Sequence, residues 1–199
     1  YLAATALQLK RMLKGSDTDG WVKLLAAVAI ILHGITAYEG FVDTNGYDLG
    51  MYPMLSLMSL SISAIVLLSS LRRPLDNLFV FIFPLAIGTV ILEIALKGDY
   101  TPRQDITAGI FSHITLSVVA YSLLTIAAAQ ALLLSFGDNM LRHHQLAILR
   151  NLPPLETMEH LMFEMIWAGL VFLTLSIGSG FVFLDDFSGP GLVHHTAIT

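Results

Sequence analysis

The residues most able to do chemistry in this chain are its histidines, since it has no cysteine and few charged side chains within its apolar runs. Three positions stand far apart in the sequence: His33, His113 and the adjacent pair His194 and His195. An ionisable side chain inside an apolar segment is a candidate functional residue, because lipid solvates it poorly. Imidazole nitrogen also binds haem iron and transition metals. These histidines therefore form the candidate site.

Membrane-spanning helices must position these histidines. Of the 199 residues, 55% are hydrophobic and only 13% are charged, whereas soluble domains average about 25% charged residues. The charges cluster between long apolar runs, as they do in polytopic helical proteins. We predict an all-α transmembrane bundle that forms one domain over residues 1–199 and belongs to a larger bundle. The predicted spans cover residues 1–13, 21–38, 51–71, 76–96, 106–136 and 160–184.

The composition excludes several kinds of site. A net charge of −5 gives no basic surface for nucleic acid. Without cysteine there is no disulfide, thiolate metal site, iron–sulfur cluster or covalent haem attachment. The sequence has no Walker loop and no H-E-x-x-H zinc motif. A few histidines could hold zinc or copper, but haem suits them better because its iron needs only one or two axial nitrogens.

The basic residues predict the orientation of the spans. They gather after the first, third and fifth spans: Lys10, Arg11, Lys14, Arg72, Arg73, Arg142 and Arg150. The loop at 39–50 has three acidic residues and neither Lys nor Arg. Because short cytoplasmic loops carry the excess of Lys and Arg, we expect the basic loops to face the cytoplasm of a bacterium whose inner membrane holds the protein.

This topology places the candidate histidines toward the outer face. His33 follows Trp21 by twelve residues, which is about 18 Å into a hydrocarbon core about 30 Å thick. His113 lies about seven residues inside the outer end of its span, and His194 and His195 follow the last span. We expect these imidazoles to meet at one depth, near enough to bind a single metal centre.

The neighbours of these histidines are small or polar. Gly34 would let a flat macrocycle approach the backbone beside His33. Gly109, His113, Ser117 and Tyr121 recur every fourth residue and share one helix face. The alternative for that face is a stripe of small and hydroxyl residues that packs against another helix. The alternative for each histidine is a hydrogen bond between helices.

Two acidic residues also have predicted roles. Asp76 stands at the start of a span, where its side chain is expected to cap the helix. Glu93 lies near the outer end of the same span, four residues before Lys97. We expect an ion pair between these two side chains in preference to a proton relay through Glu93.

The segment around His113 resembles a known family. Residues 112–124 read SHITLSVVAYSLL, which is similar to the H-x-x-x-S-x-x-A-Y helix of the cytochrome c assembly (CcsA/CcmC-like) membrane proteins. Residues 152–156 (LPPLE) and 173–183 (LTLSIGSGFVF) look like the next helix of that family. With LHG at 32–34 and the late histidine pair, the pattern is closest to the HemX-like and YpjD-like branch.

The resemblance implies a haem-handling membrane protein of cytochrome c assembly. By this resemblance His113 is an outer-side haem ligand, and by their placement His33 and His195 are candidate partners for iron. The predicted cofactor-binding residues are His33, Gly34, His113, Tyr121, His194 and His195, and the predicted metal ligands are His33, His113 and His195. The expected cofactor is haem b, and the expected partners are the lipid bilayer and cytochrome c maturation or haem-trafficking proteins.

One departure from the family pattern bears on catalysis. The synthase branches carry a tryptophan-rich W-x-W-D segment, whereas residues 185–195 here have no tryptophan and the chain has only Trp21 and Trp167. We therefore expect a protein that holds or passes on haem and is not an enzyme. The alternatives are a structural or transport-accessory subunit whose histidines only pack helices, and a transition-metal binder.

Overall fold

The fold is a bundle of antiparallel helices. The computed structural model describes residues 1–14, 19–43, 46–96, 103–104, 106–143 and 153–183. Its helices are α1 (Leu2–Lys14), α2 (Asp19–Phe41), α3 (Met51–Ser70), α4 (Phe79–Ala95, preceded by the 3₁₀ turn η1, Asp76–Leu78), α5 (Ala108–Arg142) and α7 (Leu155–Phe183). This confirms the predicted all-α polytopic class. Five of the segments are long and apolar enough to cross a membrane, and α1, with 13 residues, is not among them.

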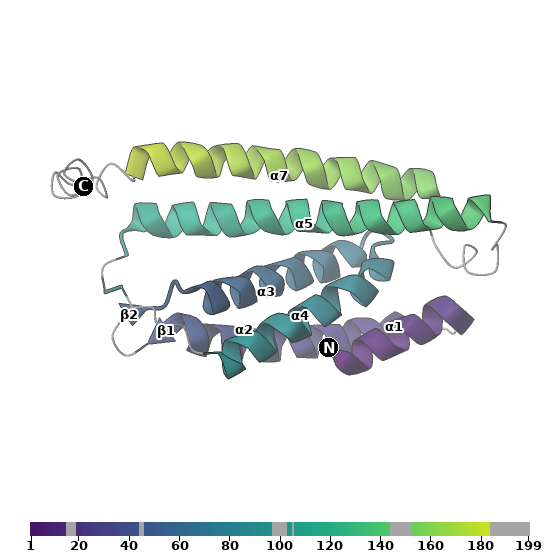
Figure 1. Cartoon of the computed structure of the whole chain (residues 1–199), viewed down its shortest axis with the longest axis horizontal. Helices are drawn as coiled ribbons and strands as arrows, with labels where there is room; N and C mark the ends of the chain where they lie inside the picture. Colours follow the sequence, from purple (N-terminus) through teal and green to yellow (C-terminus); the bar gives the residue numbers. More distant parts are fainter. Residues whose placement is uncertain (15–18, 44–45, 97–102, 105, 144–152, 184–199) are drawn as a thin grey trace, which may run out of the picture.

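The helices are arranged in successive layers (Figure 1). Helices α5 and α7 run side by side along one edge, and α5 also packs against α3. On its other side α3 packs against α2 and α4, and these two contact α1. The largest fully buried apolar side chains come from η1, α4 and their neighbours, and Phe79 stacks on Phe83 with ring centroids 4.6 Å apart. The core therefore lies mainly among α1 to α5, and α7, at the edge of the bundle, contributes Met158 and Leu161 to it.

The two ends of the bundle differ in character. At one end lie strands β1 (Val42–Asp43) and β2 (Gly46–Tyr47), and Tyr47 forms a further bridge with Arg103. We call this the sheet end. The other end, which we call the basic end, carries Lys10, Arg11, Lys14, Lys23, Arg72, Arg73 and Arg142. Successive helix connections lie alternately at the basic end and at the sheet end, as the predicted topology requires.

The short strands were not predicted from the sequence, and Gly46 explains how they fit. Gly46 has φ +133°, a conformation that side chains with a Cβ rarely adopt. A Cβ there would also collide with the carbonyl group of Arg103. Glycine therefore lets the α2–α3 connection lie directly against the α4–α5 connection. The helix boundaries that differ most from the predicted spans are the end of α5, which continues to Arg142, and the start of α7 at Leu155.

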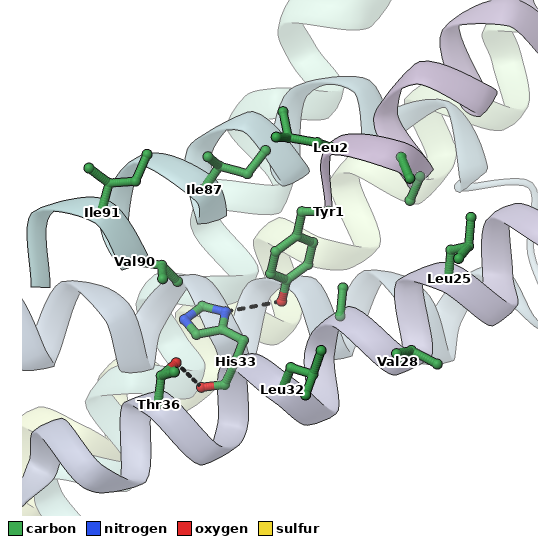
Figure 2. A pocket seen from close by; sticks show the side chains of 13 residues that line it. Tyr1, Leu2, Leu25, Val28, Leu32, His33, Thr36, Ile87, Val90 and Ile91 are labelled. Carbon is green, nitrogen blue, oxygen red and sulfur yellow. Dashed lines mark hydrogen bonds between the residues drawn. The ribbon is translucent and has the colours of Figure 1, made fainter. Parts of the chain in front are cut away.

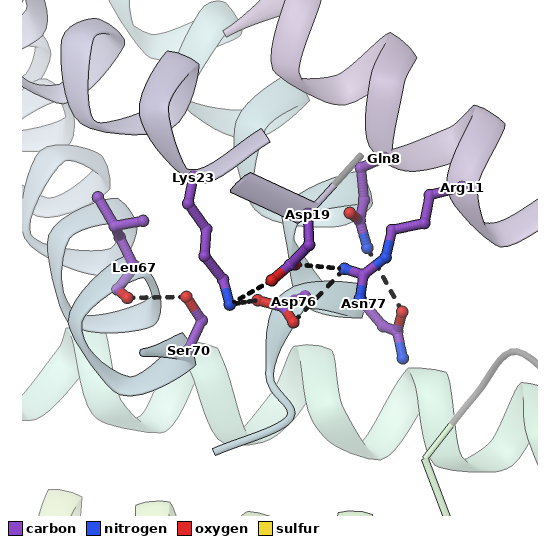
Figure 3. Close-up of polar contacts among 8 residues, drawn as sticks. All are labelled: Gln8, Arg11, Asp19, Lys23, Leu67, Ser70, Asp76 and Asn77. Carbon is purple, nitrogen blue, oxygen red and sulfur yellow. Dashed lines mark hydrogen bonds and ion pairs between the residues drawn. The ribbon is translucent and has the colours of Figure 1, made fainter. Parts of the chain in front are cut away.

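Four charged residues join three elements at the basic end (Figure 3). Arg11 on α1 pairs with Asp19 at 2.7 Å and with Asp76 at 3.5 Å. Lys23 on α2 pairs with the same two carboxylates at 2.9 and 3.4 Å. The prediction that Asp76 caps its helix is wrong, since no side-chain cap bond forms at η1 or α4. The two cations attract its carboxylate more strongly than a single backbone N–H would.

Candidate functional site

His33 lies in the interior of the bundle, on α2, and is only 3% exposed. Its Nδ1 lies 3.0 Å from the hydroxyl of Tyr1, which directly precedes α1 (Figure 2). Its Nε2 lies 2.9 Å from Ser56 Oγ of α3. The ring edge also faces Tyr1, with centroids 5.6 Å apart. Both ring nitrogens therefore have hydrogen-bond partners, and iron could bind His33 only after one of these bonds breaks.

An apolar cavity of about 490 Å³ lies beside His33, between α1, α2 and α4. Figure 2 shows the ring at its wall, among aliphatic side chains such as Leu32 and Val90. Its volume lies within the range of small-molecule sites, about 300–1,000 Å³. The ring nitrogens point to Tyr1 and Ser56, so the cavity holds apolar surface and no free ligand nitrogen.

The role predicted for Gly34, the close approach of a flat ligand to the backbone, stays a prediction. A Cβ built on Gly34 would meet no atom within 4 Å. No neighbouring helix therefore requires glycine at this position, and the residue does not line the cavity beside His33. Its backbone is open on that face of α2.

His113 has a different kind of partner. On α5 it is half-buried, and its Nδ1 lies 2.9 Å from the carbonyl oxygen of Ser176 and 3.1 Å from Ser179 Oγ, both on α7. A carbonyl oxygen can only accept, so Nδ1 carries the proton. In the neutral ring Nε2 then has the lone pair, and no described residue forms a hydrogen bond to it. This is the tautomer that binds a metal through Nε2.

The predicted stripe on α5 does pack against α7 over most of its length. A Cβ on Gly109 would collide with the Phe183 ring, which shows how closely the helices approach there. One turn beyond His113, Ser117 Oγ lies 2.6 Å from Ser176 Oγ. Tyr121, the last member of the stripe, is 50% exposed. The helix-packing alternative therefore describes Gly109 and Ser117, while Tyr121 faces outward.

The structure does not bring His33 and His113, the two candidate histidines that it describes, onto one partner. His33 bonds to Tyr1, just before α1, and to α3, whereas His113 bonds to α7. Both belong to the half of the bundle nearer the sheet end, since His33 is eight residues from the end of α2 and His113 five residues from the start of α5. His194 and His195 lie outside the described residues. Among the residues that are described, no group of three His, Asp or Glu side chains could hold a metal ion.

Comparison with known proteins identifies a family and several relatives. A family model described as Cytochrome C assembly protein matches residues 21–195. The chain is also 27% identical over 191 residues to the Inner membrane protein YpjD of Escherichia coli strain K12, a match that covers 94% of this chain and 72% of the relative. The same protein from Escherichia coli strains O6:H1 and O157:H7 matches equally. No solved structure matches the chain.

The chain belongs to the cytochrome c assembly protein family. The resemblance stated from the residues around His113 is thereby confirmed, and the matched range includes both His33 and His113. In this cytochrome c assembly protein the two histidines nevertheless have different surroundings. One is fixed by a backbone carbonyl, and the other is held between two hydroxyl groups.

A buried polar layer beside His33 was missed from the sequence. Ser59 Oγ lies 2.5 Å from Thr89 Oγ1 between α3 and α4. Glu93 of α4 points its carboxyl group at Gly40 of α2, and both carboxyl oxygens are buried. Its predicted partner Lys97 lies outside the described residues. The available signal was the spacing of Ser56, Ser59 and Ser63, which places three hydroxyls on one face of an apolar helix.

Proposed function

We propose that this cytochrome c assembly protein binds haem b non-covalently, with Nε2 of His113 as an axial ligand of the iron. One observation carries the proposal: Nδ1 of His113 donates to the Ser176 carbonyl oxygen at 2.9 Å. Metal-ligating histidines almost always donate their second ring N–H in this way, because the bond fixes the tautomer and makes the other nitrogen a better ligand. Haem, when bound, supplies a redox-active iron held by nitrogen ligands.

The protein's own residues would hold and orient this group. The α5–α7 contact fixes the plane of the His113 ring, since Ser179 Oγ and the Ser176 carbonyl both bond to Nδ1. A second axial ligand could come from His195 or His194. His33 is left out of the proposed ligand set because its two ring nitrogens already bond to Tyr1 and Ser56.

The proposed role is to hold haem and pass it on, without catalysing a reaction. The sheet end, which carries His33 and His113, would face the outer side of a bacterial inner membrane, and the basic end would face the cytoplasm. Partners would be cytochrome c maturation or haem-trafficking proteins. Absence of the tryptophan-rich segment in residues 185–195 supports a non-enzymatic role.

Absorption spectroscopy of the purified chain with added haem tests the proposal. We expect a Soret band that saturates as haem is added. In His113→Ala the apparent haem affinity should fall at least tenfold, because the axial nitrogen is lost. His160→Ala is the matched control, since His160 is an exposed helix histidine near the basic end whose Nδ1 pairs with Glu164. Equal haem affinity in both variants would remove His113 from the site.

A packing role is the second candidate, and the surroundings of His33 favour it. With hydroxyl partners at Tyr1 and on α3, His33 links α2 to α3 and to the segment that begins α1 without any cofactor. If His33→Ala lowers the stability of the chain but leaves the haem spectrum unchanged, His33 has this role. If neither histidine variant changes the spectrum, the packing role extends to both residues.

A further inference from the structure

A cavity of about 390 Å³ lies at the basic end of the bundle, away from the proposed haem site. The turn after α3 supplies Arg72 and Arg73 to its wall. The first turns of α7 supply Glu156, His160 and Glu164. The volume lies within the range of small-molecule sites, about 300–1,000 Å³. The basic end therefore has a cavity lined by charged groups of both signs.

An ion pair joins the two walls of this cavity. The Arg73 guanidinium pairs with the Glu164 carboxylate, and Nδ1 of His160 lies 3.4 Å from the other oxygen of the same carboxylate. These contacts hold the turn after α3 against α7. Because the charges of Arg73 and Glu164 already compensate each other, the charges available to a ligand must come from other side chains.

Arg72 and Glu156 are the charged side chains of the cavity that remain available. Both are exposed, and within the described part of the chain neither side chain forms a hydrogen bond or an ion pair. A guanidinium group binds phosphate oxygens through two parallel N–H donors. A carboxylate accepts hydrogen bonds from an ammonium group. A ligand that carries both a phosphate and an ammonium group would therefore satisfy both residues.

The sequence of α7 puts this cavity at the depth of the phospholipid head groups. Residues 165–183 have no charged side chain and measure about 28 Å along the helix, close to a hydrocarbon core of about 30 Å. Residues 155–164, which line the cavity, therefore lie in the head-group layer at the basic end (Figure 1). At the boundary, Phe163 and Trp167 are 49% and 69% exposed and offer an apolar surface to acyl chains.

We propose that this cavity binds the head group of a phospholipid with a phosphate and a primary ammonium group, as in phosphatidylethanolamine. The phosphate binds Arg72, and the ammonium group donates to Glu156. The arginines and glutamates of the wall cancel in charge, which matches a zwitterion better than an anionic head group. A quaternary ammonium fits less well, because aromatic side chains usually hold it and the described lining includes no Trp, Tyr or Phe. The inference goes beyond the proposed function, because it needs neither haem nor His113.

Native mass spectrometry of the full chain in detergent tests the preference for this head group. The chain is titrated separately with phosphatidylethanolamine, phosphatidylcholine and phosphatidylglycerol that carry identical acyl chains. We expect phosphatidylethanolamine to bind about three- to fivefold more tightly than either of the others, which is the effect of one ion pair near a surface. Equal affinities, or tighter binding of another lipid, would overturn the proposal.

Two variants test the assigned contacts. Arg72→Ala and Glu156→Gln should each abolish the preference for phosphatidylethanolamine. Glu156→Gln should also bind phosphatidylglycerol more tightly than the wild-type chain does, because the cavity then has a net positive charge. Arg142→Ala and Glu159→Gln are the matched controls, since both residues are exposed at the same end and neither lines this cavity. A preference that survives in the first two variants, or is lost in the controls, would contradict the assignment.

Free phosphoethanolamine distinguishes a soluble ligand from a membrane lipid. Added at the concentration of the lipid, it should leave phosphatidylethanolamine bound, because only the lipid also covers Phe163 and Trp167 with its acyl chains. Displacement of the lipid at equal concentration would assign the cavity to a soluble phosphate compound and overturn the lipid proposal.

Discussion

His113 and His33 are both imidazoles in apolar helices, but the chemical type of their partners differs. The Ser176 carbonyl can only accept a hydrogen bond, so it fixes the proton of His113 on Nδ1. The hydroxyls of Tyr1 and Ser56 can donate or accept, so they tolerate either tautomer of His33. A fixed tautomer suits a metal ligand, whereas two hydroxyl partners suit a ring that joins neighbouring segments by hydrogen bonds. The partners thus separate two residues of one type into two roles.

Ser179→Ala is a test of the fixed tautomer. The change removes one of the two acceptors of Nδ1, and the Ser176 carbonyl remains. Loss of an outer-shell partner typically costs about 10–100-fold in metal affinity. With one acceptor left we expect a loss near the lower end, about tenfold, in the apparent haem affinity measured by absorption titration. Ser112→Ala, which removes only a hydroxyl bonded to its own helix, should leave the affinity unchanged.

At the scale of elements, glycine decides how closely α7 lies against α5. A Cβ on Gly169 would meet Leu124 Cδ2 at 2.8 Å and Leu123 Cβ at 3.4 Å. Gly178, nine residues later on the same helix, has no atom within 4 Å of such a Cβ. The α5–α7 contact therefore depends on the small residue at 169 and not on the one at 178. In membranes close approach of this kind is a main source of helix association.

Leucine substitutions at these two glycines should have different effects. Gly169→Leu forces the two helices apart, and overpacking of this kind costs about 1–3 kcal/mol. Gly178→Leu introduces the same side chain without a clash, so its effect on the free energy of unfolding should be small or favourable. Thermal unfolding in detergent, followed by circular dichroism, measures the difference. Equal stability of the two variants would contradict the close packing at Gly169.

The junction of α1, α2 and η1 gives a second prediction at this scale. Asp76, whose side chain is 15% exposed, pairs with both Arg11 and Lys23. Asp76→Asn leaves these cations facing a neutral group, and for a partly buried pair we expect a loss of about 1–2 kcal/mol in unfolding free energy. Asp138→Asn is the control. Its pair with Arg142 is exposed on one helix, and its loss should cost under about 0.5 kcal/mol.

For the whole molecule, the separation of basic and sheet ends predicts its orientation in the membrane. Because the chain has no native cysteine, single cysteines can be introduced directly. Cysteine at position 39, at the sheet end, should react with a membrane-impermeant maleimide in intact spheroplasts. Cysteine at position 72, at the basic end, should react only after permeabilisation, as the excess of Lys and Arg there implies. The opposite labelling pattern would invert the proposed topology.

Much of the fold could be predicted because apolar length and loop charge are local properties of a sequence. The six helical segments and their alternation follow from them. The strands at the sheet end could not be predicted, because they depend on Gly46 meeting Arg103 from a distant connection. The hydrogen-bond partners of His33 and His113 could not be predicted either, because they lie on distant segments of the chain. For Asp76 the local sequence favoured a helix cap, but its carboxylate pairs with Arg11 and Lys23, which lie far away in the sequence.

The oxygen atom that holds the His113 proton belongs to α7, whereas the ring belongs to α5. A slide of α7 by one residue along its axis, about 1.5 Å, would carry this oxygen away from Nδ1. In a ring without bound iron the proton could then move to Nε2, and this nitrogen would no longer have a lone pair for the metal. If haem binds as proposed, the position of α7 along α5 would thus determine how well His113 holds the iron.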